Sequence, residues 1–458
     1  MERIWSRFAH FIYVGTTKCI INSLNFSLVC MEFSVTPKPH VALTRDEIAL
    51  FSSELLVLLE EGGILINSPD EDDALLYKVL SGHKKFDICN LRFLISLDCN
   101  MDCSYCQIER NLSSADFNKN MSANTVITAL SLFESLCDTD NKLTINFTGG
   151  EPLLNFDKIR SSVQLIKSSD VLKNSRLVVF TNGTLLNQER AEFFRDNNFL
   201  VIVSLDGADD IHGPRRKFRN GKSTYQQALH GYLLAQKIGC NCSISAVADL
   251  NIANINDWLS WLISLKPLSV GLNYQHQLLN NEAIEVDFNA YTNLVLTANE
   301  ALNKNGILLE NYERFSKPYN DGTIRWRECQ ACGRGITVDS SGNIGPCKSL
   351  LVSKKIAFPL SSFNPIYNEC FNAWAERTPL KHEVCLGCPA ISICGGGCAY
   401  DAYCIHDGDA LKMDKRMCEH VKSIFCDILR KKIATASNQP LESNNPLKDT
   451  RILDTVGH

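Results

Sequence analysis

The hydrophobic pattern between Leu91 and Lys304 alternates short apolar runs with longer amphipathic stretches. The short runs are nearly continuous in apolar and β-branched residues, which is typical of parallel strands buried on both faces. Each is followed by a segment with helical spacing of its apolar positions. We therefore expect an α/β fold of six strand–helix units, which is too few for a closed eight-fold barrel. The predicted strands are 91–96, 143–147, 177–181, 200–204, 242–247 and 269–274, and the predicted helices are 123–136, 156–167, 188–195, 225–237, 255–265 and 288–304.

The segment 31–90 has the pattern of a small separate α+β unit. Thr44 and Glu47 form a capping box before an apolar stripe, which predicts a helix that ends at Gly62-Gly63. A short strand over 64–66 and a second helix over 70–80 follow. The pattern predicts a domain that precedes the barrel.

The two ends of the chain are expected to be poorly ordered. Residues 1–30 are moderately apolar, but Lys18 and Asn22 interrupt the run and no cleavage motif follows. They make a poor signal peptide and a poor membrane span, so we expect a weakly ordered extension or an upstream start-site artefact. Residues 434–458 are rich in Asn, Ser and Pro and are predicted to be a disordered tail.

The composition is that of a globular protein of two or three domains, except for its cysteines. The chain has 458 residues, with 45% hydrophobic and 21% charged residues and a net charge of −5, which argues against nucleic-acid binding. No other stretch approaches a membrane span, so we expect a cytoplasmic protein without a membrane partner. The 20 cysteines indicate metal or cluster ligation rather than disulfides.

Cys99, Cys103 and Cys106 are spaced C-x3-C-x2-C. Three thiolates at this spacing can hold three irons of a 4Fe–4S cube and leave the fourth iron open, whereas most clusters have four cysteines. A zinc site is the alternative, but zinc ribbons usually pair two C-x2-C motifs. The spacing, with Tyr105 before the last cysteine, resembles the radical S-adenosylmethionine (SAM) superfamily.

Three strand ends carry further motifs of this resemblance. Gly149-Gly150-Glu151 follows the second strand, and glycines there let a ligand approach the backbone. In the superfamily this motif binds the methionine amino group of SAM. The resemblance implies further SAM contacts, although Asn182-Gly183 and Asp206-Gly207 also suit simple turns. The candidate cofactor-binding residues are Tyr105, Gly149, Gly150, Glu151, Thr181, Asn182, Ser204, Asp206 and Arg216, and the candidate catalytic residues are Cys99, Cys103, Cys106 and Glu151.

The resemblance also implies a partial (β/α)6 TIM-type barrel over residues 91–310 and a mechanism. By this resemblance, SAM would bind the open iron. One electron from a flavodoxin- or ferredoxin-type donor would then cleave SAM, and the resulting 5′-deoxyadenosyl radical would abstract hydrogen from the substrate.

Residues 325–426 contain a second cysteine pattern. Seven cysteines from Cys332 to Cys418 match the SPASM domain of radical SAM peptide and protein modifiers, and two zinc sites are the alternative. The resemblance implies two auxiliary 4Fe–4S clusters, or three clusters in all. Cys329, Cys332, Cys347 and Cys398 would hold the first auxiliary cluster, and Cys385, Cys388, Cys394 and Cys418 the second.

The substrate expected from the resemblance is a ribosomally made peptide, with a crosslink or related modification as the product. The unit 31–90 is a candidate for gripping a leader peptide by strand addition, or it covers the barrel end. Formylglycine formation on a sulfatase is the alternative, but Lys348 replaces the Asp that serves those enzymes as base. A non-catalytic iron–sulfur electron carrier is a third possibility, which the intact SAM motifs disfavour.

Overall fold

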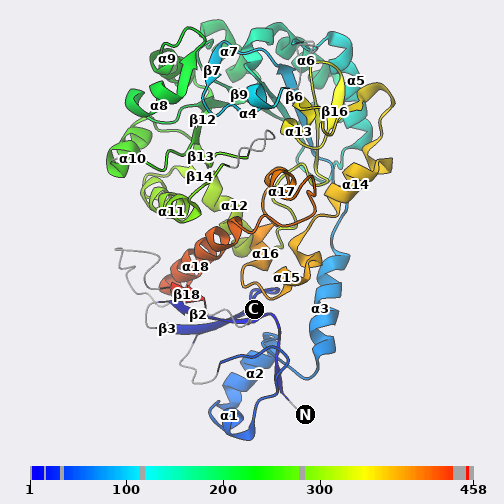
Figure 1. The fold of residues 1–458 in the computed structure, drawn as a ribbon, viewed down its shortest axis with the longest axis vertical. Helices are drawn as coiled ribbons and strands as arrows, with labels where there is room; N and C mark the ends of the chain where they lie inside the picture. The colour runs from blue at the N-terminus through cyan, green and yellow to red at the C-terminus, as the bar shows by residue number, and fades with distance from the viewer. Residues whose placement is uncertain are drawn as a thin grey trace.

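The computed structural model describes residues 3–14, 17–30, 36–112, 119–252, 254–277, 284–436 and 450–452. Figure 1 shows an upper barrel, a cysteine-rich region against it, and a small N-terminal unit below. The long helix α18 (Met417–Ala436) lies between the N-terminal unit and the barrel.

One large sheet forms the barrel. Its strand order is β14-β13-β12-β10-β9-β8-β6-β15-β16-β17, and the run from β14 to β15 is parallel throughout. The predicted α/β partial barrel of six strand–helix units is confirmed, and each predicted strand is present. The barrel strands are β6 (Asn90–Ser96), β8 (Thr144–Gly149), β9 (Arg176–Thr181), β10 (Leu200–Ser204), β12 (Asn241–Val247), β13 (Ser269–Asn273) and the short β14 (Leu308–Leu309).

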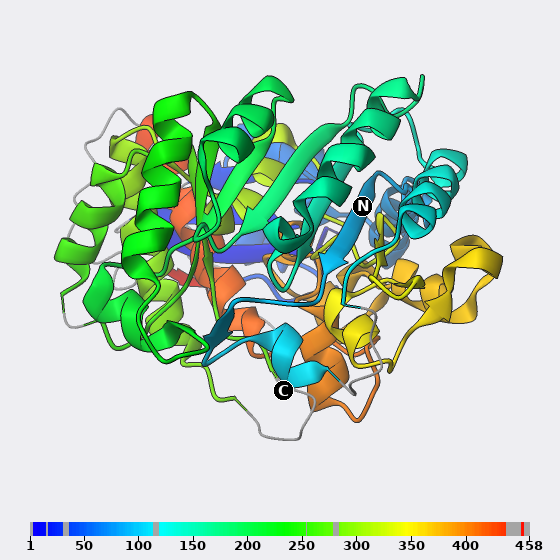
Figure 2. The ribbon, with the colours of Figure 1, turned by 90° about the horizontal axis from the view of Figure 1, so that it is seen from above.

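Helices cover the outer side of this sheet, as Figure 2 shows from above. Phe93 and Phe147 stack with ring centroids 5.6 Å apart in the layer between sheet and helices. The outward-facing residues of the strands are therefore apolar, while the opposite face looks into the barrel. The covering helices are α5 (Ala123–Leu136), α6 (Phe156–Ser168), α7 (Gln188–Asp196), α9 (Tyr225–Ile238), α10 (Ile255–Ser264) and α11 (Phe288–Lys304).

Short elements lie at the carboxyl ends of the barrel strands. They build the loops that follow β6, β8 and β10, where the candidate site residues are found. These elements are β7 (Met101–Cys103), α4 (Gln107–Asn111), η1 (Pro152–Asn155), α8 (Asp209–Arg215) and β11 (Arg216–Phe218).

The prediction that residues 1–30 are a weakly ordered extension is wrong for the described part. Phe8, Phe11 and Ile20 are fully buried; Phe11 and Ile20 pack in one core with Leu55 and Leu59, and Phe8 packs with Leu380 and Ile391. The first 30 residues and the segment 36–81 therefore form one unit rather than a tail and a domain. Its elements are β1 (Ile4–Trp5), β2 (Ala9–Val14), β3 (Thr17–Asn22), β4 (Leu28–Cys30), α1 (Arg45–Ala49), α2 (Ser53–Glu61), β5 (Leu65–Ile66) and α3 (Pro69–Ser81).

Two sheets organise this unit. β5 pairs with β1, and β2, β3 and β4 form an antiparallel meander. The predicted disordered tail lies mostly outside the described residues, but Thr450–Ile452 (β18) pairs with β2.

Among the described residues after α11, two long helices were not predicted, α12 (Glu310–Asp321) and α18, whose last residues 434–436 fall in the predicted tail. β15 then adds to the barrel sheet beside β6, and short helices carry most of the later cysteines. No helix of the described residues is long and apolar enough to cross a membrane. The remaining elements are β15 (Gly335–Val338), β16 (Asn343–Gly345), α13 (Lys348–Val352), β17 (Phe358–Pro359), η2 (Leu360–Ser362), η3 (Pro365–Tyr367), α14 (Glu369–Ala375), η4 (Pro379–Lys381), α15 (Glu383–Leu386), α16 (Ile391–Cys394) and α17 (Ala399–Ile405).

His420 on α18 makes the packing of this helix sensitive to acid. Its ring is buried against Tyr291, its Nδ1 lies 2.9 Å from the Thr292 hydroxyl, and burial lowers its pKa to about 4. The unfolded chain takes up this proton near pH 6.5, so the histidine's contribution to stability falls as pH decreases from about 6.5 to about 4. We expect a loss of about 2 kcal/mol between pH 6.5 and 5 from this group. Thermal unfolding at both pH values should show a smaller pH dependence in His420→Gln, and an unchanged dependence would contradict this assignment.

Candidate active site and cysteine groups

The loop that carries the first three cysteines is fixed by the glycine pair after β8. The Gly150 amide donates to the Ser96 carbonyl at 2.8 Å, and the Glu151 amide donates to the Asp98 carbonyl at 2.8 Å. A Cβ on Gly149 would lie 2.0 Å from the Ser96 carbonyl oxygen. The sequence predicts that these glycines admit a ligand, but in the structure the close approach is made by the backbone leading to Cys99.

Gly149→Ala should therefore displace the cysteine loop. We expect the free energy of unfolding to fall by at least about 2 kcal/mol, because the clash adds to a φ of +139°. Gly221→Ala is the matched control, since Gly221 also has a positive φ of +82° but nothing within 4 Å of an added Cβ. Equal losses in denaturant unfolding of both variants would show that backbone strain alone is responsible.

Cys99, Cys103 and Cys106 lie together at the carboxyl ends of β6 and β8. Cys103 is in β7, opposite Arg216 of β11, and Cys106 caps α4 by accepting from the Glu109 amide at 3.4 Å. Burial is the main cause that raises the pKa of Cys99 to about 12 and of Cys103 to about 11, and the neighbouring thiols add to it. A metal or cluster would hold such thiols as thiolates, so the donor set fits the predicted iron site.

Glu151 is completely buried beside this loop. One carboxylate oxygen accepts from the Thr181 hydroxyl at 2.7 Å and from the Leu153 amide at 3.0 Å, and the other accepts from the Asn182 amide at 2.7 Å. Burial raises its pKa to about 7 despite these hydrogen bonds. The Asn182 side chain continues to the Asn100 side chain at 2.9 Å and to Cys99 Sγ at 3.9 Å. The structure thus brings together three strand ends that the sequence predicts to share one site.

Asp206 joins the cysteine loop to the end of β10. Its carboxylate accepts from the Tyr105 hydroxyl and from the Val247 amide, and it lies 3.1 Å from Arg216 Nε. Burial raises the pKa of Asp206, but the charges of Arg216 and Arg215 outweigh this and hold it below its usual value. Both arginines also lie over the Tyr105 ring. Tyr105, Asp206 and Arg216, which are predicted to bind the cofactor, therefore contact one another in this structure. Their contact with SAM stays a prediction, and so does that of the half-buried Ser204.

The eight later cysteines fall into two groups, and the cysteines of the described residues form no disulfide. The first group comprises Cys329, Cys332, Cys347 and Cys398. Burial raises the pKa of Cys347 and of Cys398, and the charges of Cys329 and Cys347 add to this effect. A hydrogen bond with Cys332 lowers the pKa of Cys329 to about 6. Burial likewise raises the pKa of Cys388 and Cys394 to about 12, and the added thiol charges come from Cys385, Cys388 and Cys418. These groups coincide with the two ligand sets expected from the resemblance, whereas their occupation by clusters stays a prediction.

Two interior cations were not recognised as a pair in the sequence. Arg92 faces the barrel interior, since Leu91 and Phe93 pack in the outer core. Burial lowers the pKa of Arg92, and the charges of Cys329 and Cys347 oppose this change. The charges of Cys347 and Cys106 likewise oppose the lowering of the pKa of Lys348 by burial. Lys348 thus lies between the first cysteine loop and the first auxiliary group. A lone Arg inside an apolar strand was the available signal.

A buried carboxylate near Cys398 was also missed. Asp401 accepts from the Tyr274 hydroxyl at 2.9 Å and from the Gln277 amide at 2.9 Å, and it lies 2.9 Å from His276 Nδ1. It joins the end of β13 to α17, two segments that are far apart in sequence and carry no motif.

Part of this chain matches a known superfamily, and much of it is similar to known proteins. Residues 93–258 match the model of the radical SAM superfamily. The chain is 23% identical to a cysteine-type anaerobic sulfatase-maturating enzyme of Clostridium novyi, over 66% of this chain and 85% of that protein. It is 24% identical to the radical SAM cyclopropyl synthase TigE of Paramaledivibacter caminithermalis, over 73% and 72% of the two chains.

Two solved structures share the fold. Native anSMEcpe with bound AdoMet and Cp18Cys peptide has a TM-score of 0.64 at 20% identity, covering 76% of this chain and 99% of that one. Streptococcus suis SuiB bound to precursor peptide SuiA has a TM-score of 0.55 at 16% identity, covering 91% and 99%. The chain therefore contains a radical SAM domain over residues 93–258. More particularly, it is related to anaerobic sulfatase maturases and to a radical SAM cyclopropyl synthase.

Proposed function

We propose that this chain is a cytoplasmic radical SAM/SPASM enzyme that modifies a ribosomally made peptide. The observation that carries the proposal is the convergence of Cys99, Cys103 and Cys106 with Glu151 at the strand ends of a radical SAM domain. Two further groups of four cysteines in the same chain support the SPASM part. The absence of disulfides among the described cysteines suits a reducing compartment.

The residues present fit three 4Fe–4S clusters and SAM. Cys99, Cys103 and Cys106 would hold the cluster that binds SAM, with electrons from a flavodoxin- or ferredoxin-type donor. When bound, this cofactor pair supplies a 5′-deoxyadenosyl radical that abstracts hydrogen from the substrate. The chain's own part is to fix the cysteine loop through Asp206 and Tyr105 and to hold Glu151 in a buried position.

The N-terminal unit supplies a surface for a leader peptide. The sequence points to residues 64–66 as part of the receiving sheet, but these pair with β1, and the meander of β2, β3 and β4 is the better candidate. Within the described residues β4 pairs with β3 alone, so its outer edge can accept an added strand.

Formylglycine formation on a sulfatase is the second candidate, because sulfatase maturases are among the relatives. Lys348 follows Cys347 where those enzymes have an acidic base. Burial and the charge of Arg92 lower the pKa of Lys348, while the thiols around it oppose that change. Lys348 in place of that acidic base favours peptide modification over this alternative.

The proposal is tested by anaerobic reconstitution. We expect about twelve irons per chain, since three 4Fe–4S clusters would fill. The neighbouring genes are first searched for a short precursor peptide. Incubation with SAM, reductant and that peptide should yield 5′-deoxyadenosine and a changed peptide mass. A sulfatase-derived peptide is the control. Modification of that peptide alone would favour the second candidate, and about four irons would remove the auxiliary clusters.

A further inference from the structure

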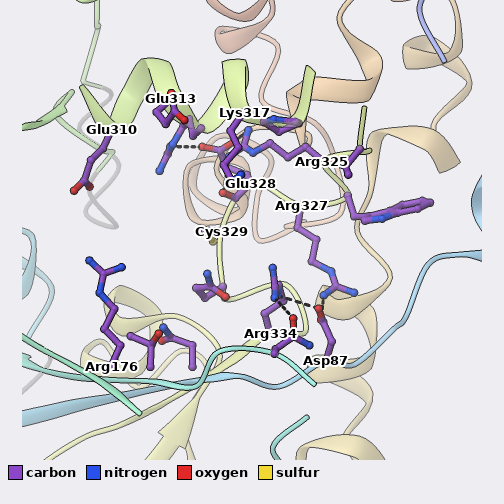
Figure 3. A pocket seen from close by; sticks show the side chains of 18 of the residues that line it. Asp87, Arg176, Glu310, Glu313, Lys317, Arg325, Arg327, Glu328, Cys329 and Arg334 are labelled. Atoms are coloured by element: carbon purple, nitrogen blue, oxygen red, sulfur yellow. Dashed lines mark hydrogen bonds and ion pairs between the residues drawn. The ribbon is translucent and has the colours of Figure 1, made fainter. Parts of the chain in front are cut away.

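The partial barrel contains a large cavity at the end opposite the cysteine loop. Its volume is about 1100 Å³, and it is lined by the first residues of the barrel strands, including Asn90, Thr144, Arg176, Leu200 and Ser269. We call this space the lower lumen. Cys99 and Glu151 follow the carboxyl ends of β6 and β8, so the lower lumen lies at the opposite, amino-terminal end of the strands. Figure 3 shows side chains that line it.

The lower lumen extends upward along the inner face of β9. Arg176, Val178 and Phe180 all line it, as expected for alternate residues of one strand. These positions span about 13 Å at 3.3 Å per residue. Phe180 directly precedes Thr181, which donates to Glu151. The upper end of the cavity therefore reaches the layer beneath the candidate SAM site.

The side chains that line the lower lumen suit a peptide with both polar and apolar groups rather than a single strongly charged ligand. Most lining charges are already paired: Glu328 lies 2.6 Å from Arg314 and 2.8 Å from Arg325, and Asp87 pairs with Arg327 and Arg334 (Figure 3). The strands add amide and hydroxyl groups, from Asn90, Asn146 and Thr144, beside apolar Val178, Phe180 and Ile202. Such walls offer hydrogen bonds to a peptide backbone and apolar surface to its side chains.

The mouth of the lower lumen adjoins the N-terminal unit. The Phe26 ring meets Tyr319 of α12 edge-on at 5.3 Å, and Lys317 and Asp321 of the same helix line the cavity. Ile324 and Trp326, also at the mouth, pack against the cluster that contains Phe8 and Leu24. β4 begins two residues after Phe26, which places its first residue near α12.

We infer that the lower lumen is the passage through which an extended substrate peptide enters, while its upstream segment pairs with the edge of β4. This inference rests on the proposed function and adds to it the route and the conformation of the substrate. A small-molecule site is the competing use of the same cavity.

The first test fills the lower lumen. Ile202→Trp places a bulky ring in it, and Leu165→Trp on the outer face of α6 is the matched control, since Leu165 is 39% exposed. With the peptide that wild-type enzyme modifies, we expect Ile202→Trp to weaken binding at least about tenfold, or by 1.4 kcal/mol, and to abolish modification. Iron content and slow SAM cleavage without peptide should remain at the control level. Unchanged peptide binding and modification in Ile202→Trp would overturn the inference.

The second test does not depend on enzymatic function. Thr144→Cys introduces a thiol in the lower lumen, and Ser135→Cys on exposed α5 is the control. Each reconstituted variant is treated with N-ethylmaleimide or with a maleimide-tagged Gly-Ser octapeptide, and labelling at the new cysteine is located by mass spectrometry. At each introduced cysteine, the labelling rate of the octapeptide is divided by that of N-ethylmaleimide. We expect this ratio for Thr144→Cys to be within about tenfold of the ratio for Ser135→Cys. Exclusion of the octapeptide with normal small-reagent labelling would overturn the passage and indicate a small-molecule site. If wild-type enzyme modifies no peptide, the proposed function fails, whereas this labelling result still decides whether the lower lumen admits an extended chain.

Discussion

Replacing Cys99, Cys103 and Cys106 together by Ala should abolish 5′-deoxyadenosine formation. Iron content should fall from about twelve to about eight per chain, because one of three 4Fe–4S clusters would lose its ligands. The three thiols lie on one loop that is tied to Gly150 and Glu151, whereas the later cysteines are held by other elements. The loss should therefore stay local.

The control is a triple variant of Cys30, Cys137 and Cys370 to Ala. These cysteines are at least partly exposed and belong to none of the three groups. It should keep full iron content and full SAM cleavage, measured by colorimetric iron analysis and chromatography of 5′-deoxyadenosine. SAM cleavage that persists in the first variant would refute the site assignment.

The barrel is predictable from sequence because its strands are continuous apolar runs. Leu200–Ser204 and the helix Phe288–Lys304 are found with the predicted bounds, since burial on both faces leaves a strong local signal. The N-terminal unit gave a weaker signal. Its capping box at Thr44 is present, but Ser52 caps a second helix, so the predicted single helix is two.

The errors came from contacts between distant segments. Residues 1–30 suit neither a signal peptide nor a membrane span in sequence, yet Phe11 and Ile20 are buried because α1 and α2 complete their core. The resemblance implies which cysteines share a cluster, but not what supports them. Asp206 and Arg216 match SAM motifs in sequence, and only the fold shows that they bind each other and Tyr105.

Arg377→Leu should remove both auxiliary cysteine groups at once. The Arg377 side chain is buried, with 2% exposed, and it donates to four backbone carbonyls. Nε reaches Ala410 at 2.8 Å, Nη1 reaches Gly397 at 2.8 Å, and Nη2 reaches Gly396 at 2.6 Å and Lys412 at 3.2 Å. No sequence motif marks this residue.

Two of the four carbonyls that Arg377 binds belong to the connection between the two cysteine groups. Gly395, Gly396 and Gly397 have φ values of +71°, +88° and +68°, and they join Cys394 of one group to Cys398 of the other. Left-handed backbone in three successive residues exposes carbonyls that need donors when buried. A single guanidinium supplies donors to two of these three carbonyls.

Loss of these bonds should cost on the order of 4 kcal/mol or more, because hydrogen bonds to charged groups contribute about 1.5–3 kcal/mol each. We expect iron content to fall from about twelve to about four per chain, while SAM cleavage at the first site persists. Arg377→Lys should recover only part of the iron, since an ammonium cannot match the planar fork. Arg195→Leu is the control, because Arg195 is an exposed partner of Asp196 and its ion pair contributes little. Full iron content and unchanged thermal stability in Arg377→Leu would show that the glycine connection is held by the cysteine ligands alone.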